Sequence, residues 1–137
     1  EADAAALEAM TQATDWTWIT GNHDPVPPRR FGGSVHEELR VGPLTLRHEP
    51  QAAPATGELA GHLHPVAAVR VRGRRLRRRC VVSDGTRAIL PAFGAYAGGL
   101  NVMDEAYANL LPAGCFHAWM LGAHTVVPVA ARRLEGD

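Results

Sequence analysis

Two short segments of the chain place imidazole and amide side chains at spacings that suit a metal centre. The first is GNHD at residues 21–24, and the second is GHLH at residues 61–64. Along extended backbone, alternate side chains share a face, so we expect His62 and His64 to point one way and Leu63 the other. Two imidazoles on one face could bind one metal ion, bind two neighbouring ions or simply be solvated.

The GNHD segment directly follows WTWIT at residues 16–20, an aromatic and β-branched stretch that predicts a strand. Asn22 and His23 would then lie at the C-terminal end of that strand, where ligands bind in open sheets with parallel strands. The Asn22 amide oxygen is a neutral, hard ligand for a divalent ion. His23 would point away from that ion and suits a proton donor or a phosphate contact. Asp24 could hydrogen-bond its imidazole and fix its tautomer.

A further histidine, His48, ends the segment LTLRH at residues 44–48, which also predicts a strand. Together the three segments give three predicted strand ends that carry an amide or an imidazole. Any one of these histidines, taken alone, would more often be an ordinary surface or core residue. The ordered set favours a shared metal cluster.

The elements that must position these side chains are mostly short strands. We expect a helix over residues 2–14, a long loop over 21–33 and two strands joined at Gly42-Pro43. The remaining expected elements are a loop at 51–58, a strand from 57 that ends in a turn at Pro65, a hairpin that turns at Gly73, a strand at 87–90, a short element at 98–103 and a closing hairpin at 116–130. This pattern predicts one α/β domain over residues 1–137, with mostly antiparallel strands and at least one helix packed outside.

Composition excludes several classes of protein. The 137 residues are 46% hydrophobic and 20% charged, as expected of a globular domain. Formal net charge is zero, so attraction to nucleic acid must come from a local patch. No apolar run approaches the roughly 20 residues that a membrane span needs, and no signal peptide is visible, so we expect a cytoplasmic protein without membrane contact. Cys80 and Cys115 are expected to be buried free thiols.

The ordered set of GNHD, a strand-final His48 and GHLH resembles the third, intervening and last motifs of the calcineurin-like metallophosphoesterase superfamily. The contexts RHEP at 47–50, LAGHLHP at 59–65 and LPAFGAYAGG at 90–99 are similar to the bacterial ligase-associated DNA-repair branch of that superfamily. The resemblance implies the C-terminal part of a four-layer α/β/β/α sandwich, and therefore a partial domain.

The resemblance also implies a role for each residue of the set. Asn22, His48 and His62 would bind one metal ion and His64 a second, while His23 would be the general acid, oriented by Asp24. Two divalent ions would be the cofactors, with manganese expected and iron, zinc or nickel as alternatives. The implied reaction is two-metal hydrolysis of phosphodiester bonds in DNA by a bridging hydroxide. DNA is the implied substrate, and DNA-repair ligases or helicases are the implied protein partners.

The sequence departs from the superfamily pattern in one respect, which leaves more than one function open. The superfamily begins with a D-x-H motif and a G-D-x-x-D motif, and neither occurs in this sequence. Since the sequence opens within a helical pattern, we expect those motifs to lie before residue 1; a degenerate relative is the alternative. The rival functions are a phosphatase or phosphodiesterase acting on a small nucleotide, and a non-catalytic module that binds metal or nucleic acid.

Several other side chains need weighing. Arg29 and Arg30, in the loop after GNHD, are expected to contact substrate phosphates. The stretch at residues 70–79 contains seven arginines, which could clamp a DNA backbone or could form the solvated face of an exposed hairpin. The remaining histidines and aromatic residues considered are expected to be structural or exposed (His36, His117 and His124) or part of the core (Trp16, Trp18 and Phe93).

Overall fold

The computed structural model describes residues 2–27, 29–52, 54–94 and 96–137, and in those ranges it is an α/β structure with mixed sheets and mostly strands. The single α-helix of these ranges, α1, spans Ala2–Ala13. The strands are β1 (Thr17–Ile19), β2 (Ser34–His36), β3 (Glu38–Val41), β4 (Leu44–Arg47), β5 (Glu58–Ala60), β6 (Pro65–Val71), β7 (Arg74–Ser83), β8 (Ala88–Ile89), β9 (Leu100–Asn101), β10 (His117–Leu121) and β11 (Val126–Ala130). Short 3-10 helices are η1 (Arg29–Phe31), η2 (Glu105–Tyr107) and η3 (Ala131–Arg133).

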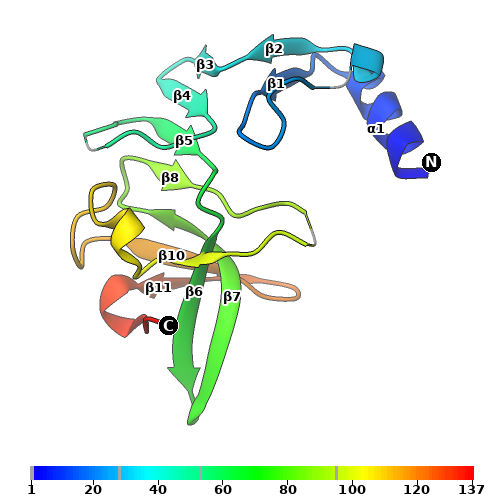
Figure 1. Cartoon of the computed structure of the whole chain (residues 1–137). Helices are drawn as coiled ribbons and strands as arrows, with labels where there is room; N and C mark the ends of the chain where they lie inside the picture. The colour runs from blue at the N-terminus through cyan, green and yellow to red at the C-terminus, as the bar shows by residue number, and fades with distance from the viewer. Residues whose placement is uncertain (1, 28, 53, 95) are drawn as a thin grey trace.

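The strands form two sheets. The small sheet pairs β1 with β2 in parallel, and the large sheet has the order β11-β10-β7-β8-β5-β4-β3, with β6 pairing β7 and β9. Figure 1 shows α1 and the β1–β2 sheet at one end of the molecule and the long β6–β7 hairpin at the other. The predicted α/β class is confirmed, and the predicted strand pairs and hairpins are present. The four-layer arrangement of a complete domain stays a prediction.

Across the two sheets, antiparallel strand pairings only narrowly outnumber parallel ones, and the parallel pairs matter for the site. Five strand pairings are antiparallel, and four are parallel. Strand β7 takes part in two sets of pairings: residues 74–79 pair with β6, and residues 80–83 pair with β10 or β8. The hairpin turns at Arg72-Gly73, which have φ angles of 50° and 76°. Two-residue hairpin turns with positive φ at both positions have a backbone twist that matches that of the flanking strands.

The hydrophobic core lies between the β6–β7 hairpin, β10 and the segment around η2. Its largest side chains include Ile89, Val82, Tyr107, Leu111, Phe116 and Met120. Cys80 is part of this core, and burial raises the pKa of its thiol to about 12. The expectation of two buried thiols is therefore right for Cys80 but wrong for Cys115, which is exposed.

Two further expectations concern the periphery. Phe93 was expected in the core, but it is fully exposed because the loop between β8 and β9 projects from the sheet (Figure 1). Trp16 and Trp18 are half-buried and pack against each other, with ring centroids 5.4 Å apart.

Helix α1 lies outside the sheets and contacts η1. In the part of the chain that the structure describes, no helix has the length and apolar character to cross a membrane.

Candidate metal centre

Two of the predicted ligands meet at one sheet edge because β4 and β5 run parallel. Their register pairs Thr45 with Glu58 and Leu46 with Leu59. The C-terminal ends of parallel strands lie at the same edge, so His48, just after β4, comes next to the turn that follows β5. A hydrogen bond of 2.9 Å from the Gly61 N–H to the His48 carbonyl joins the two strand ends.

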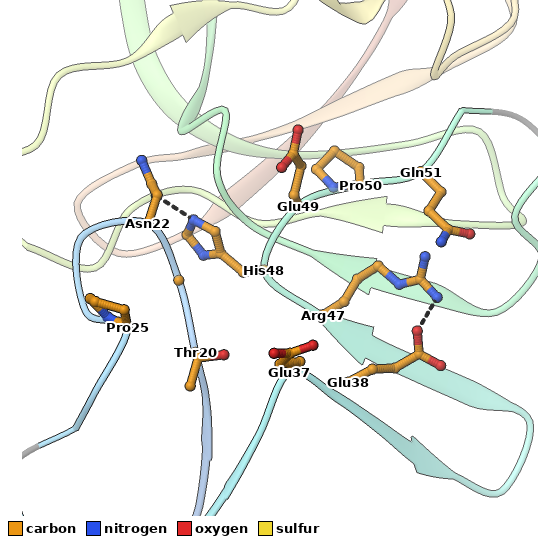
Figure 2. Close-up of a pocket in the computed structure, with 11 residues that line it drawn as sticks. Thr20, Asn22, Pro25, Glu37, Glu38, Arg47, His48, Glu49, Pro50 and Gln51 are labelled. Atoms are coloured by element: carbon orange, nitrogen blue, oxygen red, sulfur yellow. Dashed lines mark hydrogen bonds and ion pairs between the residues drawn. The ribbon is translucent and has the colours of Figure 1, made fainter.

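The third ligand arrives from the small sheet. Strand β1 is joined to β2 by parallel pairing and by a 2.9 Å hydrogen bond from the Thr20 N–H to the His36 carbonyl. Glu37 alone separates β2 from β3, so this nearly continuous strand couples the two sheets. The end of β1 is thereby held beside the end of β4, where Asn22 reaches His48 (Figure 2).

The side chains of Asn22, His48 and His62 gather at this edge. Asn22 Oδ1 lies 2.7 Å from His48 Nε2, and His62 Nδ1 lies 3.2 Å from the same nitrogen. The two imidazole rings meet edge to face, with centroids 5.1 Å apart. The structure therefore brings together the three residues expected to share one metal ion.

The arrangement of these three atoms is better explained by coordination of one cation than by hydrogen bonds among them. His48 Nε2 carries either one hydrogen or one lone pair, so it can form only one of its two close contacts as a good hydrogen bond. Two ligand atoms about 2.1 Å from one ion lie roughly 3.0–3.4 Å apart at octahedral or tetrahedral angles, close to the spacings seen here. Within the described residues, no three His, Cys, Asp or Glu side chains are placed to hold an ion, so this set depends on the Asn22 amide.

The turn at residues 61–64 differs from the extended backbone that the sequence predicted. His62 and His64 have φ angles of 65° and 49°, in the left-handed region. The alternation argument that assigned them a common face is therefore wrong, although His62 still reaches His48. Non-glycine residues adopt this conformation at a cost of about 1–3 kcal/mol each, and they cluster at functional sites.

The core helps to hold this turn in place. The buried Tyr107 hydroxyl donates a hydrogen bond of 3.4 Å to the Leu63 carbonyl. Burial raises the pKa of Tyr107, so the hydroxyl keeps its proton and remains a donor at neutral pH. This contact connects the strained segment to the main hydrophobic cluster, and no pattern in the sequence indicated it.

Partial burial and nearby charge both favour the neutral imidazole of His48. Partial burial lowers the pKa of His48, and the neighbouring His62, His64 and His23 lower it further, while Glu49 opposes the change. A neutral imidazole is the form that ligates metals. Neither the His64 ring nor the His23 ring contacts the three predicted ligand atoms among the described contacts. The assignment of His64 to a second ion stays a prediction.

The predicted partnership of His23 and Asp24 is not formed in the structure. Both side chains are exposed, and no hydrogen bond or ion pair joins them in the described part of the chain. The backbone of Asp24 instead closes the loop, because its carbonyl accepts a hydrogen bond of 3.4 Å from the Gly21 N–H. A surface loop of this kind leaves His23 free to approach a bound substrate.

The two arginines expected at the substrate lie in η1. The side chain of Arg29 falls outside the described residues. The Arg30 guanidinium stacks on the Phe31 ring, 4.5 Å from its centroid, and Arg30 is not among the described residues that line the groove beside His48. The structure therefore does not bring Arg30 to the three predicted ligands, because η1 packs against α1 instead.

An open groove of about 700 Å³ lies beside Asn22 and His48. Three glutamates that no sequence motif marked as functional line it: Glu37, Glu38 and Glu49. Glu38 forms an ion pair with Arg47 (Figure 2), whereas Glu37 and Glu49 are exposed. Carboxylate oxygens are good ligands for divalent ions, so Glu37 and Glu49 add negative charge where a cation is expected. The position of Glu49 directly after His48 was the available signal.

A buried ion-pair network beneath the site was also missed. Glu58, on β5, is 2% exposed and lies between Arg47 and Arg87. The Gln51 backbone N–H donates to Glu58 Oε1 at 2.9 Å, and Arg87 Nη1 donates to the Gln51 carbonyl at 2.7 Å. This network joins β4, β5 and the residue before β8, and its Arg47 directly precedes His48 in the chain.

Gly21 allows the close approach of the His48 ring, and this gives a direct test of the geometry. A Cβ atom at this position would lie 2.7 Å from His48 Nδ1, well inside contact distance. We expect Gly21→Ala to displace the ring, weaken metal binding and lower any hydrolytic rate by about 100-fold, as misplacement by about 1 Å typically does. Gly98→Ala is the matched control, since nothing lies within 4 Å of its Cβ position. Mn²⁺ titration by calorimetry checks both variants, and equal affinities would contradict the packing argument.

Comparison with solved structures shows a similarity to a nuclease. The chain is similar to the crystal structure of Pseudomonas putida nuclease MPE, with 32% sequence identity and a TM-score of 0.66 over 92% of this chain. This chain spans 61% of the length of that nuclease. No protein-family model matches the chain, and neither does any curated protein. The fold of the chain is therefore nuclease-like over most of its length.

Proposed function

We propose that residues 1–137 carry part of the active centre of a metal-dependent phosphodiesterase that acts on nucleic acid, with DNA as the expected substrate. The observation that supports this most directly is the convergence of Asn22 Oδ1 and His62 Nδ1 on His48 Nε2. The similarity to a nuclease at 32% identity supports the same conclusion. The motifs quoted above favour the ligase-associated branch of the calcineurin-like metallophosphoesterases.

The proposed roles follow from chemistry and position. Asn22, His48 and His62 would hold one divalent ion, for which manganese is the first candidate, and His64 would contribute to a second. Bound ions would supply polarisation of the phosphoryl oxygens and a lowered pKa for the attacking water. His23, on the exposed loop beside Asn22, would donate a proton to the departing oxygen of the phosphodiester.

The shape of the groove bears on the rival substrate class. A closed pocket would suit a small nucleotide, whereas the groove beside His48 is open to solvent. Its carboxylates would repel a free nucleotide in the absence of bound metal. The open shape favours a long substrate held by contacts outside the groove over a small phosphomonoester.

Hydrolysis assays on the complete gene product test the proposal. We expect Mn²⁺-dependent cleavage of bis(p-nitrophenyl) phosphate and of a DNA oligonucleotide, and loss of both with a chelator. Cleavage of the nitrophenyl ester alone would favour the small-substrate rival. Absence of both activities with manganese, iron, zinc and nickel would favour a binding module.

The proton-donor role of His23 predicts a split between substrates. His23→Ala should retain metal but lose about 10²–10⁴-fold in rate on DNA, whose leaving alkoxide needs a proton. On bis(p-nitrophenyl) phosphate the loss should be much smaller, because nitrophenolate leaves without one. His124→Ala, at an exposed loop position, is the control. Equal losses on the two substrates would argue against an acid role.

A further inference from the structure

The seven arginines of the β6–β7 hairpin do not form one uniform patch. Arg70 on β6 lies directly opposite Arg75 on β7, and Arg75 and Arg77 are two residues apart, so all three lie on one face. We call Arg70, Arg75 and Arg77 the arginine row. Arg75 and Arg77 are separated along β7 by about 6.8 Å, twice the rise of a strand residue.

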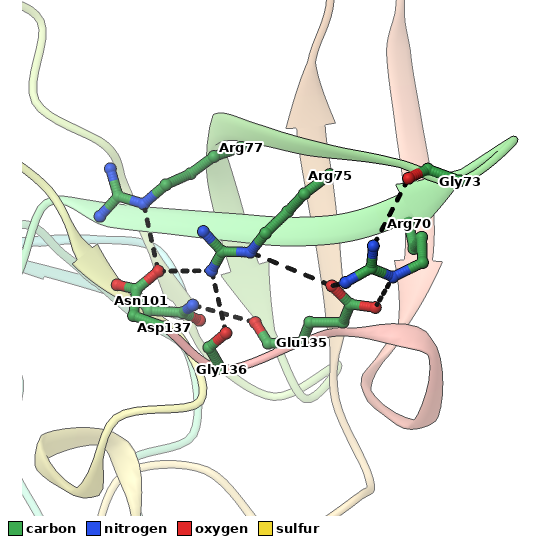
Figure 3. A network of polar contacts seen from close by, with 8 residues as sticks. All are labelled: Arg70, Gly73, Arg75, Arg77, Asn101, Glu135, Gly136 and Asp137. Atoms are coloured by element: carbon green, nitrogen blue, oxygen red, sulfur yellow. Dashed lines mark hydrogen bonds and ion pairs between the residues drawn. The ribbon is translucent and has the colours of Figure 1, made fainter.

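Carboxylates from the segment after η3 pair with this row, a feature that neither interpretation of the hairpin from sequence included (Figure 3). Arg70 Nε donates to Glu135 Oε1 at 3.0 Å, and its Nη2 reaches Glu135 Oε2 at 3.4 Å. Arg75 Nη2 donates to Asp137 Oδ1 at 2.6 Å, and Arg77 Nε lies 3.5 Å from the same oxygen. The arginine row is therefore neither bare nor merely solvated.

These ion pairs are open to exchange. The side chains of Glu135 and Asp137 are 33% and 54% exposed, and those of the arginine row are 38–58% exposed. Exposed ion pairs contribute little to stability and weaken with salt. The hydrogen bond from Arg75 lowers the pKa of Asp137, so this carboxylate stays charged to a more acidic pH than an ordinary aspartate. Another anion of suitable geometry could take its place.

The arginine row also leads toward the metal ligands. Arg77 Nη2 donates to the Gly99 carbonyl at 2.7 Å. The next residue, Leu100, donates its backbone N–H to the His64 carbonyl at 3.2 Å. A chain of phosphates that enters the site near His64 could therefore continue along β7 past Arg77 and Arg75.

We propose that the arginine row binds the phosphate backbone of the nucleic-acid substrate and that Glu135 and Asp137 act as internal competitors for it. This inference rests on the proposed function, which supplies nucleic acid as the partner. Phosphate and carboxylate oxygens accept the same paired hydrogen bonds from a guanidinium. The two carboxylates thus occupy the row when substrate is absent and yield it when a phosphate chain arrives.

Binding measurements without metal separate this inference from the proposed function. A fluorescein-labelled oligothymidine is titrated with the full chain in a chelator, across a series of salt concentrations. Glu135→Gln/Asp137→Asn should bind about tenfold more tightly at low salt. Its plot of log affinity against log salt should steepen by about 0.7–0.9 for each additional phosphate that the arginines neutralise. The matched control is Glu8→Gln/Glu105→Gln, which removes the same charge from two exposed sites that have no arginine partner among the described residues.

A second pair of variants keeps the inference testable if the first one is less stable. Arg75→Gln/Arg77→Gln should weaken binding and flatten the salt dependence, and the tighter binding caused by the acidic substitutions should vanish in that background. Unchanged affinity in the arginine variant, or equal affinities for the acidic variant and its control, would overturn the inference. If tighter binding is seen but no ester is hydrolysed in the separate assays, the inference stands and the proposed function fails. If the protein hydrolyses phosphodiesters but substitution of these four side chains leaves DNA binding unchanged, the proposed function stands and this inference fails.

Discussion

Replacing His62 with alanine in the complete gene product is expected to remove metal and activity together. His62 Nδ1 is one of two atoms placed against His48 Nε2 among the described contacts, so its loss leaves Asn22 Oδ1 as the one remaining partner described there. Loss of a residue that merely orients a ligand costs about 10–100-fold in metal affinity, and loss of the ligand itself should cost more than about 100-fold. Mn²⁺ binding by calorimetry and phosphodiester hydrolysis measure the two effects.

The control for this prediction is His124→Ala, which removes an exposed imidazole far along the sequence from the cluster. It should leave metal content and rate unchanged. His62→Gly is a useful companion, because glycine also relieves the left-handed backbone at this position. Like His62→Ala, this variant should lose metal. Its free energy of unfolding should be at least as high as that of the unsubstituted protein. If His62→Ala keeps both its metal content and its activity, the assignment of this ligand set is wrong.

The cluster was predictable because its parts sit at the ends of strands that the sequence marks clearly. WTWIT and LTLRH were recognisable as strands, and β1 and β4 do end just before Asn22 and His48. What the sequence could not provide was the pairing between distant strands. The parallel register of β4 with β5, which sets His48 beside His62, depends on packing across the whole sheet.

The failures have specific physical causes. The prediction for residues 61–64 assumed extended backbone, yet both histidines have positive φ, and a hydrogen bond from Tyr107 holds Leu63 between them. Arg30 is close to GNHD in sequence, but its guanidinium stacks on Phe31, and its contact with a substrate stays a prediction. Closeness in sequence is a weak guide inside a long loop, because the loop can carry its two ends to different layers.

The arginines at residues 70–79 illustrate a related limit. Strand alternation could have sorted them into two faces, but only the structure reveals the carboxylates that face one of them. Glu135 and Asp137 are about sixty residues away in sequence and reach the hairpin through an antiparallel bridge between Ala68 and Glu135. Long-range ion pairs of this kind leave no local pattern.

The buried glutamate behind the site gives the largest expected effect on stability. Glu58 is 2% exposed, and the side chain of its partner Arg87 is 1% exposed. Arg87 Nη2 lies 3.4 Å from Glu58 Oε2 without hydrogen-bond geometry, so their attraction is mainly electrostatic. Arg47, the residue before His48, lies 3.7 Å from the other carboxylate oxygen. One carboxylate therefore compensates two guanidinium groups, one of them fully buried.

Glu58→Ala is expected to lower the free energy of unfolding by about 3–5 kcal/mol, because it leaves the Arg87 charge buried without compensation. Denaturant unfolding followed by circular dichroism measures the change. Glu105→Ala, an exposed glutamate without ion pairs among the described residues, should change stability by less than about 0.5 kcal/mol. Since Arg47 adjoins His48, the loss of the Glu58 carboxylate should also weaken Mn²⁺ binding by the protein that is still folded.

A double substitution separates the cost of an unpaired charge from the value of the pair itself. In Glu58→Leu/Arg87→Met the buried charges are removed together, and well-packed apolar side chains often replace buried ion pairs at no cost. We expect this variant to recover most of the stability lost in Glu58→Ala. It should not recover full metal affinity, because Arg47 would then lack one of the two carboxylates that fix it beside His48. If instead metal affinity returns together with stability, the network serves the fold alone and does not position the ligand.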